Sequence, residues 1–175
     1  MFNTEQNCTT MNEMQVQMWD NPRFRNWVAV ARACQLVQQA LARELKPLDL
    51  KPPHLDIIVN LMRSEGISQQ DLAHKLLVGR SNMTMLLPQM EERGLIERRP
   101  DQADRRVLRL HLTAQGKALA KRAIAIQSDL IDEVMSVSSP EHCEIIGDAM
   151  RRMTALMLER DKIGMATRTR KEQKA

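Results

Sequence analysis

The sequence predicts a mainly α-helical protein with one small β-hairpin near the middle of the chain. Apolar residues recur every three or four positions through most of the 175 residues, which is typical of amphipathic helices. Residues 95–112 instead alternate between apolar and polar side chains around a polar turn, which is typical of a strand pair. Because 43% of the residues are hydrophobic and 27% are charged, the composition is that of an ordinary globular domain.

The N-terminal part is expected to be a flexible segment followed by one long helix. Residues 1–20 are polar and rich in Met, Asn and Gln, so we expect them to be poorly ordered. Asn21 can cap a helix that begins at Pro22, and apolar residues then recur at helical spacing as far as Lys46-Pro47. We therefore expect one helix over residues 21–48.

Residues 50–113 are expected to begin with two helices. Pro52-Pro53 starts the first, and Gly66 offers a left-handed cap at its end. Ser68 and Asp71 approximate a capping box at the start of the second, which we expect to be short and to end at Gly79.

A third helix and a hairpin complete this segment. The helix is expected from Arg80-Ser81 to Gly94, with Met83, Leu87 and Met90 on its apolar face. Strands are expected at 95–99 and 107–112. This order of elements predicts a winged helix-turn-helix lobe over residues 50–113.

Two further helices are expected at the C-terminal end. Thr113 can cap the first and Pro140 can start the second, so residues 114–163 are expected to be helical. The long helices carry more apolar surface than the lobe can cover, and apolar helix faces must be buried. We therefore expect residues 21–48 and 114–163 to be dimerisation helices of a homodimer. A monomeric helical bundle is the alternative.

The charge and the cysteines limit the possible classes of protein. Residues 160–175 hold six Lys/Arg and two acids, which accounts for the whole net charge of +4, so the overall charge alone is weak evidence for nucleic acid. We expect residues 164–175 to be a basic flexible tail, which either contacts phosphates or only keeps the chain soluble. Cys8, Cys34 and Cys143 are widely spaced and odd in number, which argues against a disulfide framework or a zinc finger.

Catalytic and targeting signals are absent from the sequence. It contains no GxSxG, GxGxxG, GxxxxGK or HExxH motif, so we expect no enzyme activity, no cofactor and no metal. It also lacks a long apolar run and a signal peptide, so we expect a cytoplasmic protein with no membrane partner.

The segment from Leu50 to Gly116 resembles the MarR family. The similarity is carried by ISQQDLAHKLLVGRSNMTMLLPQMEERGLIERR and, more specifically, by DQADRRVLRLHLTAQG. The resemblance implies a transcriptional regulator that binds a pseudo-palindromic site on double-stranded DNA. It also implies a repressor that a small anionic or aromatic effector releases.

A helix-turn-helix places its second helix in the major groove, and the resemblance implies that the hairpin reaches the minor groove. For each residue outside the hairpin, the alternative is a plain helix cap or a solvated polar side chain. The residues expected to bind DNA are Ser68, Gln69, Gln70, Arg80, Ser81, Asn82, Thr84, Met85, Gln89, Arg98, Asp104, Arg105 and Arg106.

Arg106 is the strongest of these candidates. The resemblance places it where an arginine enters the minor groove, and Asp104 is expected to orient the arginines instead of touching DNA. The alternative is a surface salt bridge worth at most about 1 kcal/mol.

Two residues depart from the family pattern. Pro88 lies inside the expected recognition helix, where proline removes an N–H and costs about 3 kcal/mol or forces a kink. The helix is therefore expected to bend or to begin later. Met85 stands where the resemblance implies an arginine.

An effector site could include Phe24, Trp27, Arg32 and His54 if the leading helix crosses the second one. The alternative is that Phe24 and Trp27 belong to the core and that Arg32 is solvated. Two further alternatives for function are a winged-helix protein-interaction module and a cysteine-based redox sensor of the same family.

Overall fold

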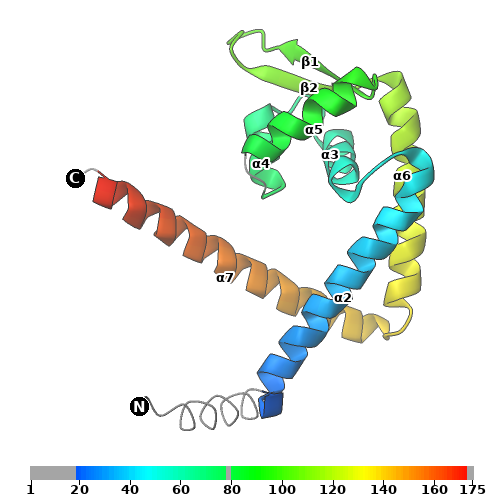
Figure 1. Ribbon diagram of the computed structural model, residues 1–175, viewed down its shortest axis with the longest axis vertical. Helices are drawn as coiled ribbons and strands as arrows, with labels where there is room; N and C mark the ends of the chain where they lie inside the picture. The colour runs from blue at the N-terminus through cyan, green and yellow to red at the C-terminus, as the bar shows by residue number, and fades with distance from the viewer. Residues whose placement is uncertain (1–18, 78–79, 173–175) are drawn as a thin grey trace, which may run out of the picture. The chain divides into compact units, whose positions relative to one another are not determined.

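The computed structural model describes residues 19–77 and 80–172, and the side chains among them except at 80–82 and 162–172. Nine elements follow one another in this part of the chain (Figure 1). They are α2 (Pro22–Leu45), η1 (Lys46–Leu48), α3 (Pro52–Arg63), α4 (Gln69–Lys75), α5 (Arg80–Glu92), β1 (Ile96–Pro100), β2 (Leu108–Leu112), α6 (Ala114–Met135) and α7 (Pro140–Glu172). The predicted fold class, a mainly helical winged helix-turn-helix, is confirmed.

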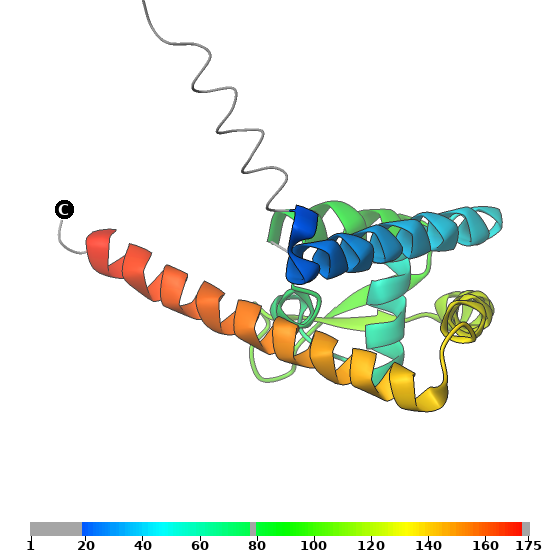
Figure 2. The same ribbon diagram turned by 90° about the horizontal axis from the view of Figure 1, so that it is seen from below.

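The chain divides into two compact units, with the division inside α6 between Leu130 and Ile131. The first unit holds the core, in which α3, α4 and α5 pack beside the hairpin (Figures 1 and 2). Leu41 and Leu45 at the end of α2 and Ala120 and Ala123 in α6 are buried in the same core. The expected lobe over residues 50–113 therefore shares its core with the helices on either side.

Capping residues mark the starts of α2 and α4. Asn21, the residue before Pro22, caps the start of α2, because its side chain accepts from the Arg23 N–H at 2.9 Å. At the start of α4, Ser68 Oγ accepts from the Asp71 N–H at 3.0 Å and donates to Asp71 Oδ2 at 2.7 Å. The shorter Asp side chain thus binds the capping hydroxyl instead of a backbone N–H.

The predicted end of α4 is wrong by about one turn. The helix stops at Lys75, and Leu77 adopts a left-handed φ of 54°. Gly79, the predicted terminator, lies outside the described residues. No local signal marks Leu77, since left-handed backbone is normally taken by Gly or Asn.

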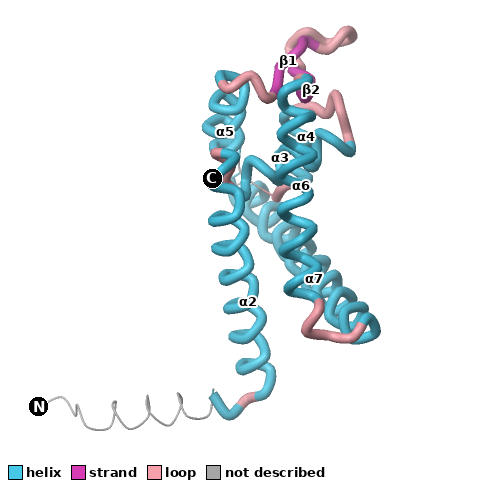
Figure 3. The backbone as a smooth tube through the Cα atoms, turned by 90° about the vertical axis from the view of Figure 1, so that its right-hand side faces the viewer, coloured by secondary structure: helices cyan, strands magenta, loops and turns pink. Residues whose placement is uncertain are grey.

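The hairpin is a two-stranded antiparallel sheet that projects as a loop beyond the helices of the first unit (Figure 3). Ile96 pairs with Leu112 at its base, and Pro100 pairs with Leu108 near its tip. Its base is buried, because Leu95, Ile96, Leu110 and Leu112 belong to the core. The sheet is therefore held rigidly at one end while residues 101–106 extend into solvent.

The second unit consists of the end of α6 and helix α7. α7 continues to Glu172, so the predicted start of a tail at 164 falls inside a helix. Many of its large apolar side chains are exposed, among them Ile145, Leu156 and Met157. No helix in the described part of the chain is long and apolar enough to cross a membrane.

Candidate nucleic-acid interface

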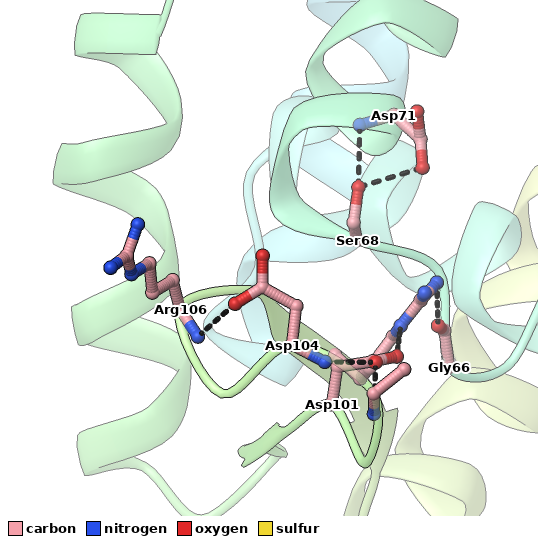
Figure 4. Close-up of polar contacts among 8 residues, drawn as sticks. Gly66, Ser68, Asp71, Asp101, Asp104 and Arg106 are labelled. Atoms are coloured by element: carbon pink, nitrogen blue, oxygen red, sulfur yellow. Dashed lines mark hydrogen bonds and ion pairs between the residues drawn. The ribbon is translucent and has the colours of Figure 1, made fainter.

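The turn of the hairpin is shaped by the carboxylate of Asp101 (Figure 4). Its Oδ1 accepts from the N–H groups of Ala103 and Asp104 at 2.8 and 3.0 Å, and its Oδ2 accepts from Arg109 Nε at 2.6 Å. The Asp104 N–H, the Arg109 side chain and the Ala103 N–H together hold the pKa of Asp101 below its ordinary value. Asp101 therefore stays ionised and the turn stays closed at neutral pH.

The second strand is also fastened to the segment that leads into α4. The Gly66 N–H donates to the Leu110 carbonyl at 2.9 Å, and the Leu110 N–H donates to the Ile67 carbonyl at 3.0 Å. Arg109 adds a bond from its Nη1 to the Gly66 carbonyl at 3.3 Å. The hairpin and the start of α4 thus form one rigid frame.

The arginines of the hairpin fall into two groups. Arg98 pairs with Glu91, Arg99 with Glu97, and Arg109 with Asp101. Arg105 and Arg106 at the tip are exposed, and neither forms an ion pair with any described residue. The uncompensated positive charge of the hairpin is therefore concentrated at its tip.

Asp104 acts within the turn. Its Oδ1 accepts from the backbone N–H of Arg106 at 3.0 Å, and the Arg106 guanidinium points away from both carboxylates (Figure 4). The carboxylate thus fixes the backbone of Arg106 and leaves its side chain available to an external anion.

Arg98 plays a different part, because its guanidinium is held by Glu91 of α5. The hydrogen bond from Arg98 lowers the pKa of the Glu91 carboxyl and raises that of Arg98, so the pair is ionised. The contact braces β1 against α5. Arg98 was expected at the DNA, but in the structure its charge is already matched within the protein.

A concave pocket of about 350 Å³ lies between the hairpin and the two helices of the helix-turn-helix. It brings together residues from three elements that the sequence predicted to bind DNA. Those that line it are Ser68, Gln69, Gln70, Thr84 and Arg106. Polar residues at the start of α4 and Arg106 of the hairpin therefore border one hollow.

Helix α5 presents its apolar stripe inward. Met83, Leu87 and Met90 are fully buried, whereas Thr84, Met85 and Gln89 are exposed. Pro88 is exposed as well, and α5 continues through it to Glu92. The side chains of the predicted contacts Arg80, Ser81 and Asn82 lie outside the described residues.

Gln89 lies beside His54 of α3, at the far end of α5 from its N-terminus. His54 is only 4% exposed, its Nδ1 accepts from the Lys51 N–H at 3.3 Å, and its buried Nε2 has no hydrogen-bond partner among the described residues. Burial, together with Arg93 and Lys51, lowers the pKa of His54, so this side chain is neutral.

The four predicted effector residues do not meet within one chain. Phe24 packs edge-on against Trp19 with 5.0 Å between ring centroids, while Trp27 is 59% exposed and Arg32 is exposed. His54 lies near Lys51, beyond the other end of α2. At 1.5 Å per residue, Phe24 is about 30 Å along the helix from Leu45.

The contacts of Asp101 with Arg109 were missed from the sequence. The two residues are eight positions apart, and only the register that pairs Arg99 with Arg109 brings them together. The expected alternation of the strand placed Arg109 on its polar face but did not name its partner. The spacing of Asp101 from the second strand is the signal that could have found it.

Cysteine and metal chemistry find little support in the described residues. Cys34 is exposed on α2, Cys143 is half-buried on α7, and both are free thiols, whereas Cys8 lies outside the description. Among the residues described, no group of His, Cys, Asp and Glu could hold a metal ion.

A helix-turn-helix beside a fixed hairpin with a cationic tip is the architecture of a winged-helix protein of the DNA-binding type. The MarR family profile matches residues 48–107. The transcriptional regulator HosA of Escherichia coli is 32% identical over 120 residues, which are 68% of this chain and 89% of that protein. The chain therefore belongs to the MarR family.

Solved structures agree with this fold. AbsC, a MarR-family regulator from Streptomyces coelicolor, gives a TM-score of 0.74 at 22% identity, covering 79% of this chain and 97% of its own. The repressor CouR, bound to a 23-mer DNA duplex, gives 0.71 at 22% identity, covering 79% and 95%. A mutant Escherichia coli MarR complexed with operator DNA gives 0.67 at 20% identity, covering 71% and 90%.

Proposed function

We propose that this MarR-family regulator binds a pseudo-palindromic site on double-stranded DNA as a homodimer and represses transcription until a small-molecule effector releases it. Each subunit inserts α5 into the major groove and the tip of its hairpin into the minor groove. The observation that carries the proposal is the pair Arg105 and Arg106, whose charges have no ion pair with a described residue and whose turn is fixed by Asp101 and Asp104.

The minor groove suits an unmatched arginine. Its negative potential is greatest where the groove is narrow, and a guanidinium remains charged at every physiological pH. A turn that is already ordered loses little conformational entropy when it binds. The CouR and MarR structures bound to DNA give the same architecture a precedent for duplex binding.

The homodimer follows from one apolar stripe on α2. Trp27, Cys34, Leu41 and Leu45 share this stripe, because they are spaced at helical intervals. The core covers its C-terminal end, where Leu41 and Leu45 are buried, but Trp27 and Cys34 are exposed. A second copy packed about a two-fold axis would cover the open end, as it would the apolar residues of α7.

Release by an effector is the part of the proposal that the resemblance implies. Because Phe24, Trp27 and Arg32 lie far along α2 from His54, a pocket that used these residues would need walls from the second subunit. The anionic effector that the resemblance implies would find cationic side chains on α2, which carries Arg23, Arg25, Arg32 and Arg43.

The test is the affinity for a duplex taken from the upstream region of the protein's own gene. Replacing Arg106 with Ala removes one charge-assisted contact from each half-site. Since such contacts are worth about 1.5–3 kcal/mol each, Kd should rise about 100-fold or more. Fluorescence anisotropy at several salt concentrations measures both Kd and the number of phosphate contacts.

Arg122→Ala is the matched control, because Arg122 is an exposed arginine of α6 away from the hairpin. This variant makes the same change in charge and should bind the duplex almost as the wild type does. Equal affinity of wild type and Arg106→Ala for the duplex would overturn the assignment of the hairpin.

A further inference from the structure

Met85 occupies the middle of the outward face of α5. It is 67% exposed, whereas Met83 and Leu87, two residues before and after it, are fully buried. At 3.6 residues per turn, Met85 lies about 160° around the helix from each of them. It therefore faces directly away from the core of the lobe.

Met85 lies next to the hollow between the hairpin and the helix-turn-helix, although it does not line it. Thr84, its neighbour in the chain, lines the same hollow as Arg106 of the hairpin and Gln69 of α4. Met85 is the sixth residue of α5, so it lies in the first two turns, which reach deepest into a major groove.

Met85 and Pro88 form an apolar section of the outward face, between the exposed polar residues Thr84 and Gln89. Pro88 follows Met85 one turn later, is also exposed, and has no N–H to donate. The thioether side chain of Met85 is at most a weak hydrogen-bond acceptor. At these two positions α5 therefore offers methyl and methylene groups to a base edge, while the exposed Thr84 and Gln89 beside them can form hydrogen bonds.

Only one base presents an apolar group in the major groove, namely thymine with its 5-methyl group. We propose that Met85 is a specificity-determining residue that packs against the 5-methyl group of one thymine in each half-site. This inference rests on the proposed function, and it names one base that the regulator selects. Methionine suits the contact because its unbranched, polarisable side chain adapts to an irregular apolar surface.

The contact can be tested by removing the methyl group from the DNA and the side chain from the protein in turn. Each thymine of the footprint is replaced by deoxyuridine, which differs only in lacking the 5-methyl group. For the wild-type protein, one symmetry-related thymine pair should be sensitive. Affinity should fall about four-fold per half-site. This fold-change corresponds to the transfer free energy of one buried methyl-sized group.

The Met85→Ala variant should bind the unmodified duplex more weakly and show no further loss when that thymine becomes uracil. Restoring the methyl group on a different base, by placing 5-methylcytosine instead of cytosine at that position, should raise the affinity of the wild type but not of Met85→Ala. Because Met85 is exposed, the variant should keep the circular dichroism and melting temperature of the wild type.

Glu92→Ala is the matched control. Glu92 is exposed and lies seven residues beyond Met85, hence about two turns further along the same face of α5. Its replacement by Ala should leave the sensitivity to uracil unchanged.

The outcomes separate this inference from the proposed function. If the wild type binds the duplex but no thymine is sensitive to uracil, or if Met85→Ala shows the same sensitivity as the wild type, the thymine contact is overturned and the proposed function stands. If the wild type binds no duplex from its upstream region in a specific, salt-dependent manner, the proposed function fails and the inference falls with it.

Discussion

Asp101 uses both of its carboxylate oxygens inside the hairpin, where they accept from two backbone N–H groups and from Arg109. Asp104 likewise accepts from the backbone of Arg106. Two acids close to a polyanion would ordinarily weaken binding, but here each is occupied by donors of the protein. The residues of the turn thus have different roles. Asp101 and Asp104 hold its conformation, and Arg105 and Arg106 supply its positive charge.

His54 gives the stability of the lobe a pH dependence whose sign is fixed by its surroundings. Because its pKa is lowered in the folded state, the unfolded chain binds a proton at a higher pH than the folded chain does. Stability is therefore full above the ordinary histidine pKa of about 6.5 and falls as the pH drops toward the folded value.

We expect His54→Gln to remove this part of the acid sensitivity. Glutamine can still accept from the Lys51 N–H but does not titrate. Melting temperatures measured between pH 7.5 and pH 5 should fall less steeply for His54→Gln than for the wild type. His142→Gln, at an exposed position of α7, should follow the wild-type curve. Identical slopes for His54→Gln and the wild type would contradict the assignment.

Among the elements, the corner between the hairpin and α6 is closely packed. Thr113 Oγ1 donates to the Gly94 carbonyl at 2.6 Å and accepts from the Gly116 N–H at 2.9 Å. A Cβ on Gly116 would lie 1.9 Å from the carbonyl oxygen of Leu95. The Leu-Thr-x-x-Gly motif therefore has a steric cause, since α6 touches the backbone at the start of β1.

Gly116→Ala should destabilise the protein by about 3 kcal/mol or more, because backbone atoms must move to relieve the overlap. Urea unfolding, monitored by circular dichroism, measures the loss. Gly147→Ala in α7 makes the same chemical change where the added Cβ meets only the movable end of Arg151. That variant should be neutral or slightly stabilised through its higher helix propensity. Similar stability of the two variants would refute the steric explanation.

The ends of the helices show how far the sequence determines secondary structure. Gly94 at φ 66° ends α5 as predicted, since glycine takes left-handed backbone without strain. The expected later start of α5 is wrong, since the helix begins at Arg80 and continues through Pro88, and the expected bend stays a prediction. The end of α4 at Leu77 could not be predicted, because there the tertiary structure imposes a conformation that the residue itself disfavours.

For the site, the arginines of the hairpin could be located from the sequence, but their partners could not. Arg98, Arg105 and Arg106 look alike in the hairpin sequence, but only the fold shows that Arg98 is paired with Glu91. The register of the strands and the packing of β1 against α5 decide which charges are matched. Such contacts between distant positions carry no local signal in a single sequence.

At the level of the whole molecule, the exposed end of the α2 stripe predicts self-association. Trp27→Glu should weaken the dimer about 30-fold or more for each copy of the residue, since a buried interfacial tryptophan is worth about 2 kcal/mol or more. Sedimentation equilibrium measures the change. Gln39→Glu adds the same charge on the opposite side of α2 and should leave the dimer intact. A monomeric wild type at micromolar concentration would contradict the homodimer.

The guanidinium of Arg93, just past the end of α5, donates to the carbonyl oxygens of Asp49 and Leu48, at the end of the short helix η1 that follows α2. These two hydrogen bonds connect the end of α5 to the segment after α2, so we expect a tilt of α2 to move α5 as well. In a homodimer, the distance between the two α5 helices would then depend on the angle at which the two α2 helices cross. A compound that binds between the two long helices and separates them could change the distance between the two α5 helices without contacting any residue that touches a base.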